Sequence, residues 1–321
     1  MSSRGRTISG VLAVIVAGAL VSGCSGKSGG DAKGSDSAVA ASAVRGFFTA
    51  LTAGDAKTAV SYLELASGSD PAGDALLTDA ALGADYRPSN VQYGAPRQQD
   101  GLTFVDVTYQ ARGETVRQNV ALAGDGKHLR SVLVGLSVTG VQGRPVSVNG
   151  VKMGNNDLNV DVFPGSYQVA ITGNVLFEGE TLAVMPQVAL GGETAAANFG
   201  PPGLTKDAGS ALQRAVRQTL DACAATARPK TPGCPFWLDV KGTGAKVTWS
   251  IKTYPGIKSQ VIAGPDGPEV TLADDGKGSA HWSGSYTDKA GHPQSGNGDI
   301  PFDVAGSAKP SDSGIKVSLA T

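Results

Sequence analysis

Hydrophobic residues recur at helical spacing in the first stretch of the chain that has the pattern of a folded domain. They fall at Val39, Val44, Phe47, Phe48 and Leu51. Apolar side chains three and four residues apart lie on one face of a helix, so this run predicts a helix from residue 38 that Gly54 ends. Asp55 then provides the N-cap of a second helix. A weaker helical stretch follows over residues 74–82.

After Pro88 the apolar positions alternate with polar ones, which is the spacing of β-strands. The alternating runs cover residues 91–93, 102–109, 116–122 and 129–134. Residues typical of turns separate these runs. Helices followed by an antiparallel sheet predict an α+β domain over residues 38–136.

Short strands joined by tight turns are predicted for residues 137–203. Asn149-Gly150 is the strongest short hairpin signal, because both residues accept the positive φ of a type I′ turn. The run from Leu158 to Phe163 alternates, Pro164-Gly165 suits a type II turn, and Tyr167 to Ile171 alternates again. These patterns predict a small β-rich module.

The last part of the chain, residues 204–321, again places one helix before several strands. Thr205 is a candidate N-cap for a helix whose apolar face carries Ala208, Leu212, Val216 and Leu220. Strand-like runs follow between Val247 and Leu319. Two arrangements fit this order, a second cone-shaped fold or a cystatin-like wrap of the sheet around the helix. The expected class of the whole protein is therefore α+β.

The first 23 residues have the pattern of a secretory signal. Arg4 and Arg6 precede an uncharged run from Ile8 to Val21, which is shorter than the roughly 20 apolar residues that a membrane-spanning helix needs. The run ends at Val21-Ser22-Gly23-Cys24. This ending resembles the lipobox of bacterial lipoproteins, and the composition is similar to that of actinobacterial proteins. An ordinary secretory signal with a cysteine at the cleavage site by chance is the alternative.

The lipobox resemblance implies a membrane anchor. It implies cleavage before Cys24 and a diacylglycerol attached to the Cys24 sulfur. Two or more acyl chains hold a protein on a membrane far better than one, so this anchor is stable. Residues 24–37 contain no residue that anchors a core and are expected to be a flexible tether, about 20 Å long for a Gly/Ser-like chain. The protein is then expected on the extracytoplasmic face of the cell membrane.

Two further segments resemble known domain families. The stretch from Ala43 to Asp55 is an aromatic helix that ends in Ala-Gly-Asp. Together with the strands after it, this stretch resembles small NTF2-like domains. That family curls its sheet into a cone, which holds a ligand, a catalytic site or only side chains. The segment from Val162 to Val169 resembles β modules of the PEGA or carboxypeptidase-regulatory kind, which are spacers and adhesion modules. The aromatic residues that would line such a cone, unless they only fill a core, are Phe47, Phe48, Tyr62, Tyr93, Phe104 and Tyr109.

Charge and cysteine content narrow the function further. The chain has 27 basic and 28 acidic residues, a net charge of −1, so no positive field is available to attract nucleic acid. If Cys24 carries lipid, Cys223 and Cys234 remain as an even pair in an oxidising compartment, and a disulfide is expected. A redox pair or metal ligands are the alternatives, but the spacing is not Cys-x-x-Cys.

The sequence carries no catalytic signature that we recognise. We expect His128 at a surface turn, His281 on a strand and His292 in a Gly-rich loop. His281 and His292 would form a site if a hairpin brought them together. Motifs for nucleophilic catalysis, phosphate binding or a metal site are missing, so we expect no cofactor and no metal. The leading hypothesis is a non-enzymatic, lipid-anchored binding or scaffold protein with an envelope-protein or cell-wall partner. The alternatives are an NTF2-like enzyme or lipid carrier with its site in the N-terminal cone, and a spacer that displays its C-terminal domain.

Overall fold

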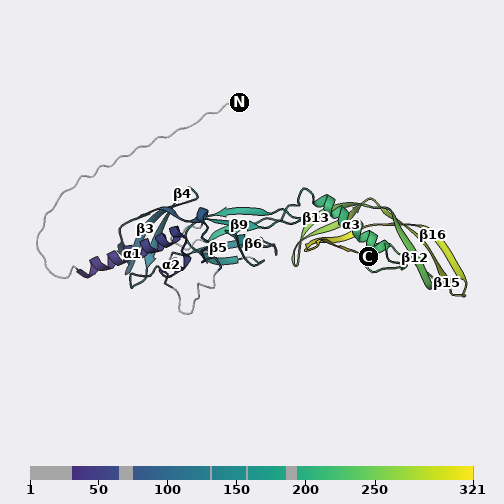
Figure 1. Ribbon diagram of the computed structural model, residues 1–321, viewed down its shortest axis with the longest axis horizontal. Coiled ribbons are helices and arrows are strands. Elements are labelled where there is room, and N and C mark those ends of the chain that lie inside the picture. Colours follow the sequence, from purple (N-terminus) through teal and green to yellow (C-terminus); the bar gives the residue numbers. More distant parts are fainter. Residues whose placement is uncertain (1–30, 65–74, 131, 157, 186–193, 321) are drawn as a thin grey trace, which may run out of the picture.

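The computed structural model describes residues 31–64, 75–130, 132–156, 158–185 and 194–320 (Figure 1). The described chain runs along the long axis of an elongated molecule, with the N-terminal part at one end and the C-terminal strands at the other (Figure 1). The expected signal peptide and Cys24 lie outside the described residues.

One long helix and a narrow sheet form the N-terminal part. Helix α1 (Asp31–Ala53) lies on the sheet, and the short helix α2 (Ala56–Val60) follows it after a turn. The Asp55 side chain accepts a hydrogen bond from the Thr58 backbone N–H at 2.9 Å, which confirms the predicted N-cap. The other elements are η2 (Ala84–Tyr86), β1 (Ser89–Tyr93), β2 (Arg97–Gln99), β3 (Leu102–Ala111) and β4 (Glu114–Leu122).

The pairing of these four strands makes the sheet narrow. Strands β1 and β2 pair one after the other with the same side of β3, and β4 pairs with the opposite side. Alternation along β3 buries Val105, Val107 and Tyr109 in the core with α1, whereas Phe104 and Asp106 belong to the other face. One sheet face is therefore covered and the other is open to solvent.

Two sheets share the core of the middle part. One sheet has the order β10-β9-β6-β7, and the other has the order β11-β5-β8. The predicted Asn149-Gly150 hairpin is confirmed, because both residues have positive φ and Val148 pairs with Val151 across the turn. The strands are β5 (Val134–Thr139), β6 (Val146–Val148), β7 (Val151–Lys152), β8 (Leu158–Val162), β9 (Tyr167–Ile171), β10 (Glu180–Val184) and β11 (Ala195–Asn198).

Long bent strands and one helix form the C-terminal part. Helix α3 (Ala208–Ala224) buries the predicted apolar face against them. Strand β12 leads into β13, β14 into β15, and β16 into β17, and the antiparallel pairing of neighbours resumes after each bend. The strands are β12 (Gly242–Thr253), β13 (Gly256–Gly264), β14 (Gly267–Asp275), β15 (Gly278–Asp288), β16 (Pro293–Phe302), β17 (Ala305–Ser311) and β18 (Gly314–Leu319).

The expected α+β class is wrong. The described residues form eighteen strands and only three α-helices, so the protein is mostly β. The N-terminal part contains α1 and the short α2, but not the full set of helices expected from the NTF2-like resemblance. The described residues 75–82 form turns instead of a third helix. In this segment, Thr78 Oγ1 donates to the Ala75 carbonyl, and Asp79 accepts from the Ala56 backbone N–H, which ties the turns to α2.

Two local expectations also need correction. Helix α1 begins at Asp31, so residues 31–37 of the expected tether are helical. The strands on either side of Pro164-Gly165 exist but do not form a hairpin. Strand β8 pairs with β5, whereas β9 pairs with β6 and β10, so the Pro-Gly pair carries the chain from one sheet to the other.

Side chains cross between the N-terminal and middle parts. Phe163 follows β8 of the middle part, yet it lies fully buried in the N-terminal core, with its ring centroid 6.2 Å from that of Phe47. In return, Leu76 and Ala81 from the N-terminal part are buried in the middle core. The Tyr86 hydroxyl donates to Gln168 at 2.8 Å across the same junction. The two cores therefore interlock.

At a second junction, residues of the middle part are buried in the C-terminal core. Leu176 and Phe177 follow β9, but both are buried in the core around α3. Backbone bonds support them, including the one from Thr205 N to the Leu176 carbonyl at 2.9 Å. Nearby, the buried Arg144 guanidinium donates to the Gly200 carbonyl at 3.0 Å. Each of the three cores thus contains residues from its neighbour in the chain.

Candidate functional site

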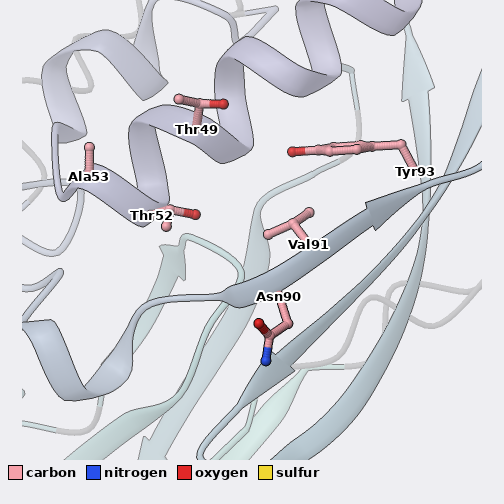
Figure 2. A pocket seen from close by; sticks show the side chains of 6 residues that line it. All are labelled: Thr49, Thr52, Ala53, Asn90, Val91 and Tyr93. Atoms are coloured by element: carbon pink, nitrogen blue, oxygen red, sulfur yellow. The ribbon is translucent and has the colours of Figure 1, made fainter.

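A hollow between α1 and β1 is one candidate site in the N-terminal part (Figure 2). It has a volume of about 430 Å³. Val91 and Tyr93 project from β1 toward the helix, and Thr49 and Thr52 project from the helix (Figure 2). Asn90 turns to the other side of the strand (Figure 2), where its side-chain amide donates to Gln110 at 3.1 Å.

The polar groups of this hollow are largely used by the protein itself. Thr52 Oγ1 donates to the Phe48 carbonyl at 2.8 Å, one turn earlier in the helix. The Arg45 guanidinium lies 5.5 Å above the centre of the Tyr93 ring, a cation–π contact. Burial raises the pKa of the Tyr93 hydroxyl, and the positive charge of Arg45 opposes this rise. Tyr93 therefore stays protonated and neutral at physiological pH.

A second hollow lies on the opposite side of the exposed ridge of α1. It has a volume of about 460 Å³ and is lined by Arg45, Gly46 and Tyr62, among others. A Cβ at Gly46 would lie 2.3 Å from the Tyr62 hydroxyl oxygen, so a larger residue there would displace the Tyr62 ring. The sequence analysis missed Thr49 and Thr52, which face these hollows. The signal available in the sequence was their polar side chains beside the apolar positions of the same helix.

The six aromatic residues proposed to line a cone do not share one cavity. Phe47, Phe48 and Tyr109 are fully buried and fill the core between α1 and the sheet. Tyr62 and Tyr93 are half-buried and each borders a different hollow. Phe104 lies on the open face of the sheet, beneath the Arg97 guanidinium at 5.5 Å. The core occupies the space that a ligand would take in a cone.

Tyr109 carries a polar group in this core. Its hydroxyl has no hydrogen-bond partner among the described residues, and it is almost fully buried. Burial raises the pKa of the phenol well above its usual range, because the charged form loses its hydration. The group is therefore a neutral phenol that offers no general base.

Cys223 and Cys234 lie as the sequence analysis expected. Their sulfur atoms are 2.09 Å apart and their Cα atoms 5.7 Å apart, as a disulfide requires. Cys223 is in the last turn of α3, and Cys234 lies in the segment that leads to β12. The bond therefore joins the end of the helix to the chain that enters the sheet.

The three histidines bind separate aspartates and form no common site. His128 Nδ1 lies 2.5 Å from Asp125, whose pKa falls to about 2 because the Lys127 backbone N–H and the His128 side chain donate to it. His281 binds Asp299 at 2.6 Å in the middle of the sheet. His292 lies beside Asp288 at the hairpin between β15 and β16. His281 pairs with Asp299, which is seven positions after His292 along the chain, so the two histidines lie about 23 Å apart along the strand.

The rest of the described chain adds no catalytic constellation. No group of three or more potential metal ligands occurs among its residues. A search of the same residues for a membrane-spanning helix finds none of sufficient length and apolarity. Comparison with protein families, curated proteins and solved structures finds no match to this chain. The function is therefore argued from the residues and their geometry alone.

Proposed function

We propose that the mature protein is a lipid-anchored binding or scaffold protein on the extracytoplasmic face of the cell membrane, without enzymatic activity. The anchor is the diacylglycerol on Cys24 that the sequence Val21-Ser22-Gly23-Cys24 implies. An envelope protein or a component of the cell wall is the partner.

The burial of side chains in the core of the adjacent part carries this proposal. Phe163 at the first junction and Phe177 at the second are both fully buried in the core of the adjacent part. Bending at either junction would expose these rings to water, at a cost of about 1.5–3 kcal/mol for each ring. An elongated body that resists bending suits a protein that holds a binding surface at a set distance from its anchor.

The shape of the N-terminal hollows agrees with a role other than catalysis. Both are open, and Phe47 and Phe48 occupy the space beneath them. The titratable group beside the first hollow, Tyr93, has its pKa raised away from neutrality. A general acid or base works best with a pKa near the operating pH, so this tyrosine is a poor candidate for one.

The proposal is tested by replacing the anchoring cysteine in cells that produce the protein. Wild-type protein should collect in the membrane fraction, and its intact mass should fit a chain that begins at Cys24 with a diacylglyceryl group. The Cys24→Ala variant should leave the membrane fraction, and a crosslinked envelope partner of the wild type should be lost with it. Cys234→Ser is the matched control and should stay on the membrane. An unmodified sulfur on Cys24 in the wild type would refute the anchor.

A further inference from the structure

The far end of the C-terminal sheet has a face made of glycine and two aromatic residues. Along β15, alternation places Trp282, Gly284 and Tyr286 on the same face. On the neighbouring β16, Gly298 pairs with Trp282 and Gly296 pairs with Gly284. On the β16 side, Trp282 and Gly284 therefore have glycines as neighbours, whereas on the β12 side they pair with Trp249 and Val247.

The indole of Trp282 leans across β16. A Cβ on Gly296 would lie 2.9 Å from Cη2 of the indole, and a Cβ on Gly298 would lie 3.2 Å from Nε1. Cη2 is the indole atom farthest from the Trp282 backbone and Nε1 belongs to the nearer five-membered ring, so the indole lies along the neighbouring strand over both glycines. Glycine at both positions makes the space that the ring occupies.

Tyr286 has the same arrangement on the other side of β15. A Cβ on Gly242 of β12 would lie 2.7 Å from Cδ2 of the tyrosine ring. Four residues separate Trp282 and Tyr286, about 13 Å along a strand. Gly284 lies between them, and a Cβ there would meet the Lys246 carbonyl at 2.4 Å. Gly284 thus leaves bare backbone on β15 between the two rings.

The polar groups of both rings are free to bind something. Trp282 Nε1 and the Tyr286 hydroxyl have no hydrogen-bond partner among the described residues. By contrast, the indole of Trp249, which is opposite Trp282 on β12, donates to the Arg228 carbonyl at 2.9 Å. Trp282 and Tyr286 are each half-buried, so part of each ring remains exposed.

On β15 and β16, this face carries no charged side chain between the two rings. Alternation places His281 and Asp299 on the opposite face, where Lys252 and His281 both bind Asp299. On the aromatic face, the carboxylate of Asp288 accepts hydrogen bonds from the hairpin backbone and from the Gln294 side chain. Strands β12, β15 and β16 extend past the end of α3 (Figure 1). The helix therefore leaves this end of the sheet uncovered.

We propose that Trp282 and Tyr286 bind an uncharged carbohydrate chain. A sugar ring has a face of C–H groups, which stacks on an aromatic face, and a rim of hydroxyls, which accept from an indole N–H and a phenol O–H. Single-stranded nucleic acid also stacks on aromatic rings but needs positive charge along its backbone, which this face does not offer. Proline-rich peptides dock into grooves between upright aromatic rings, whereas the indole of Trp282 lies over the glycines of β16. The proposal does not rest on the anchor at Cys24.

Titration of the folded protein with soluble oligosaccharides tests this site. The probes are hexamers of β-1,4-linked glucose, β-1,4-linked N-acetylglucosamine and β-1,4-linked mannose, and calorimetry gives the affinity. At least one hexamer should bind, and Trp282→Ala should weaken that binding about tenfold, because a stacking partner is lost. Tyr286→Ala should weaken it by a smaller factor. Trp237→Ala is the matched control and should leave the affinity unchanged, because Trp237 is 47% exposed and its recorded ring contact is with Lys230, not with Trp282 or Tyr286.

A second readout avoids any doubt about folding of the variants. In the wild-type protein, the indole N–H signal of Trp282 in an NMR spectrum should shift on addition of the bound hexamer, while that of Trp249 should not. Absence of binding by all three hexamers at millimolar concentration would overturn the proposal. So would an affinity that Trp237→Ala reduces and Trp282→Ala does not, or binding of a proline-rich peptide at Trp282 in place of the sugars.

Discussion

The N-terminal sheet and the far end of the C-terminal sheet use one strand face in opposite ways. In β3, the face toward the helix carries Val105, Val107 and Tyr109, all buried. In β15, the corresponding alternation gives Trp282, Gly284 and Tyr286, which remain partly exposed. Large side chains fill a space that a helix covers, whereas glycines leave room for rings to lie on the strands. The first face stabilises the fold, and the second is suited to binding a ligand.

The first way to test this comparison is to empty the shared core at the first junction. Phe163→Ala should lower the free energy of unfolding by about 3–5 kcal/mol, because a fully buried ring leaves a cavity between two parts of the protein. Urea unfolding measures the effect, and hydrogen exchange should show that both the N-terminal and middle parts lose protection.

The matched control for this change is Phe104→Ala. Phe104 is on the open face of the same N-terminal sheet and half-buried, so its removal should cost about 1 kcal/mol or less. Equal losses from the two variants would contradict the claim that Phe163 belongs to the N-terminal core.

The second test of the comparison concerns the C-terminal part, in which a disulfide as well as packing holds the end of α3 to the chain that enters the sheet. Replacement of Cys223 and Cys234 by serine should lower the free energy of unfolding of this part by about 3 kcal/mol, because the bond closes a loop of about a dozen residues in the unfolded chain. Hydrogen exchange should show the loss around α3 and β12, with protection of β3 and β4 unchanged. A loss spread equally over the whole molecule would contradict this division.

Several elements could be predicted because their signals are local. The Asn149-Gly150 turn, the cap at Asp55 and the apolar face of α3 each depend on residues a few positions apart. The pairing of Cys223 with Cys234 followed from the number of cysteines left after Cys24. Local chemistry determines such features, so the sequence reveals them.

The errors concern contacts between distant segments. Nothing around Pro164-Gly165 indicates that β8 and β9 belong to different sheets, because the choice of partner strand depends on β5, β6 and β10. The position of Phe163 in a neighbouring core was missed for the same reason. The α+β class was wrong because the helices near residue 38 were given too much weight against the strands of the last hundred residues.

The aromatic face at the far end of the molecule had a signal that the sequence analysis did not use. Glycine alternates with other residues at Gly284, Gly296 and Gly298, near Trp282 and Tyr286. Glycine inside a strand often marks a place where another group approaches the backbone closely. The register that places Trp282 beside Gly298 comes only from the fold.

The most direct test of the interlocked body is a distance measurement between its two ends. Spin labels at Arg117→Cys and Lys246→Cys, both exposed, would report on the N-terminal and C-terminal sheets in a chain that carries Cys24→Ala. A pair at Lys246→Cys and Lys258→Cys, within the C-terminal part, is the reference. Interlocked cores predict a distance distribution between the ends as narrow as that of the reference pair. A broad distribution between the ends with a narrow one in the reference would show that the parts move independently and would contradict the account.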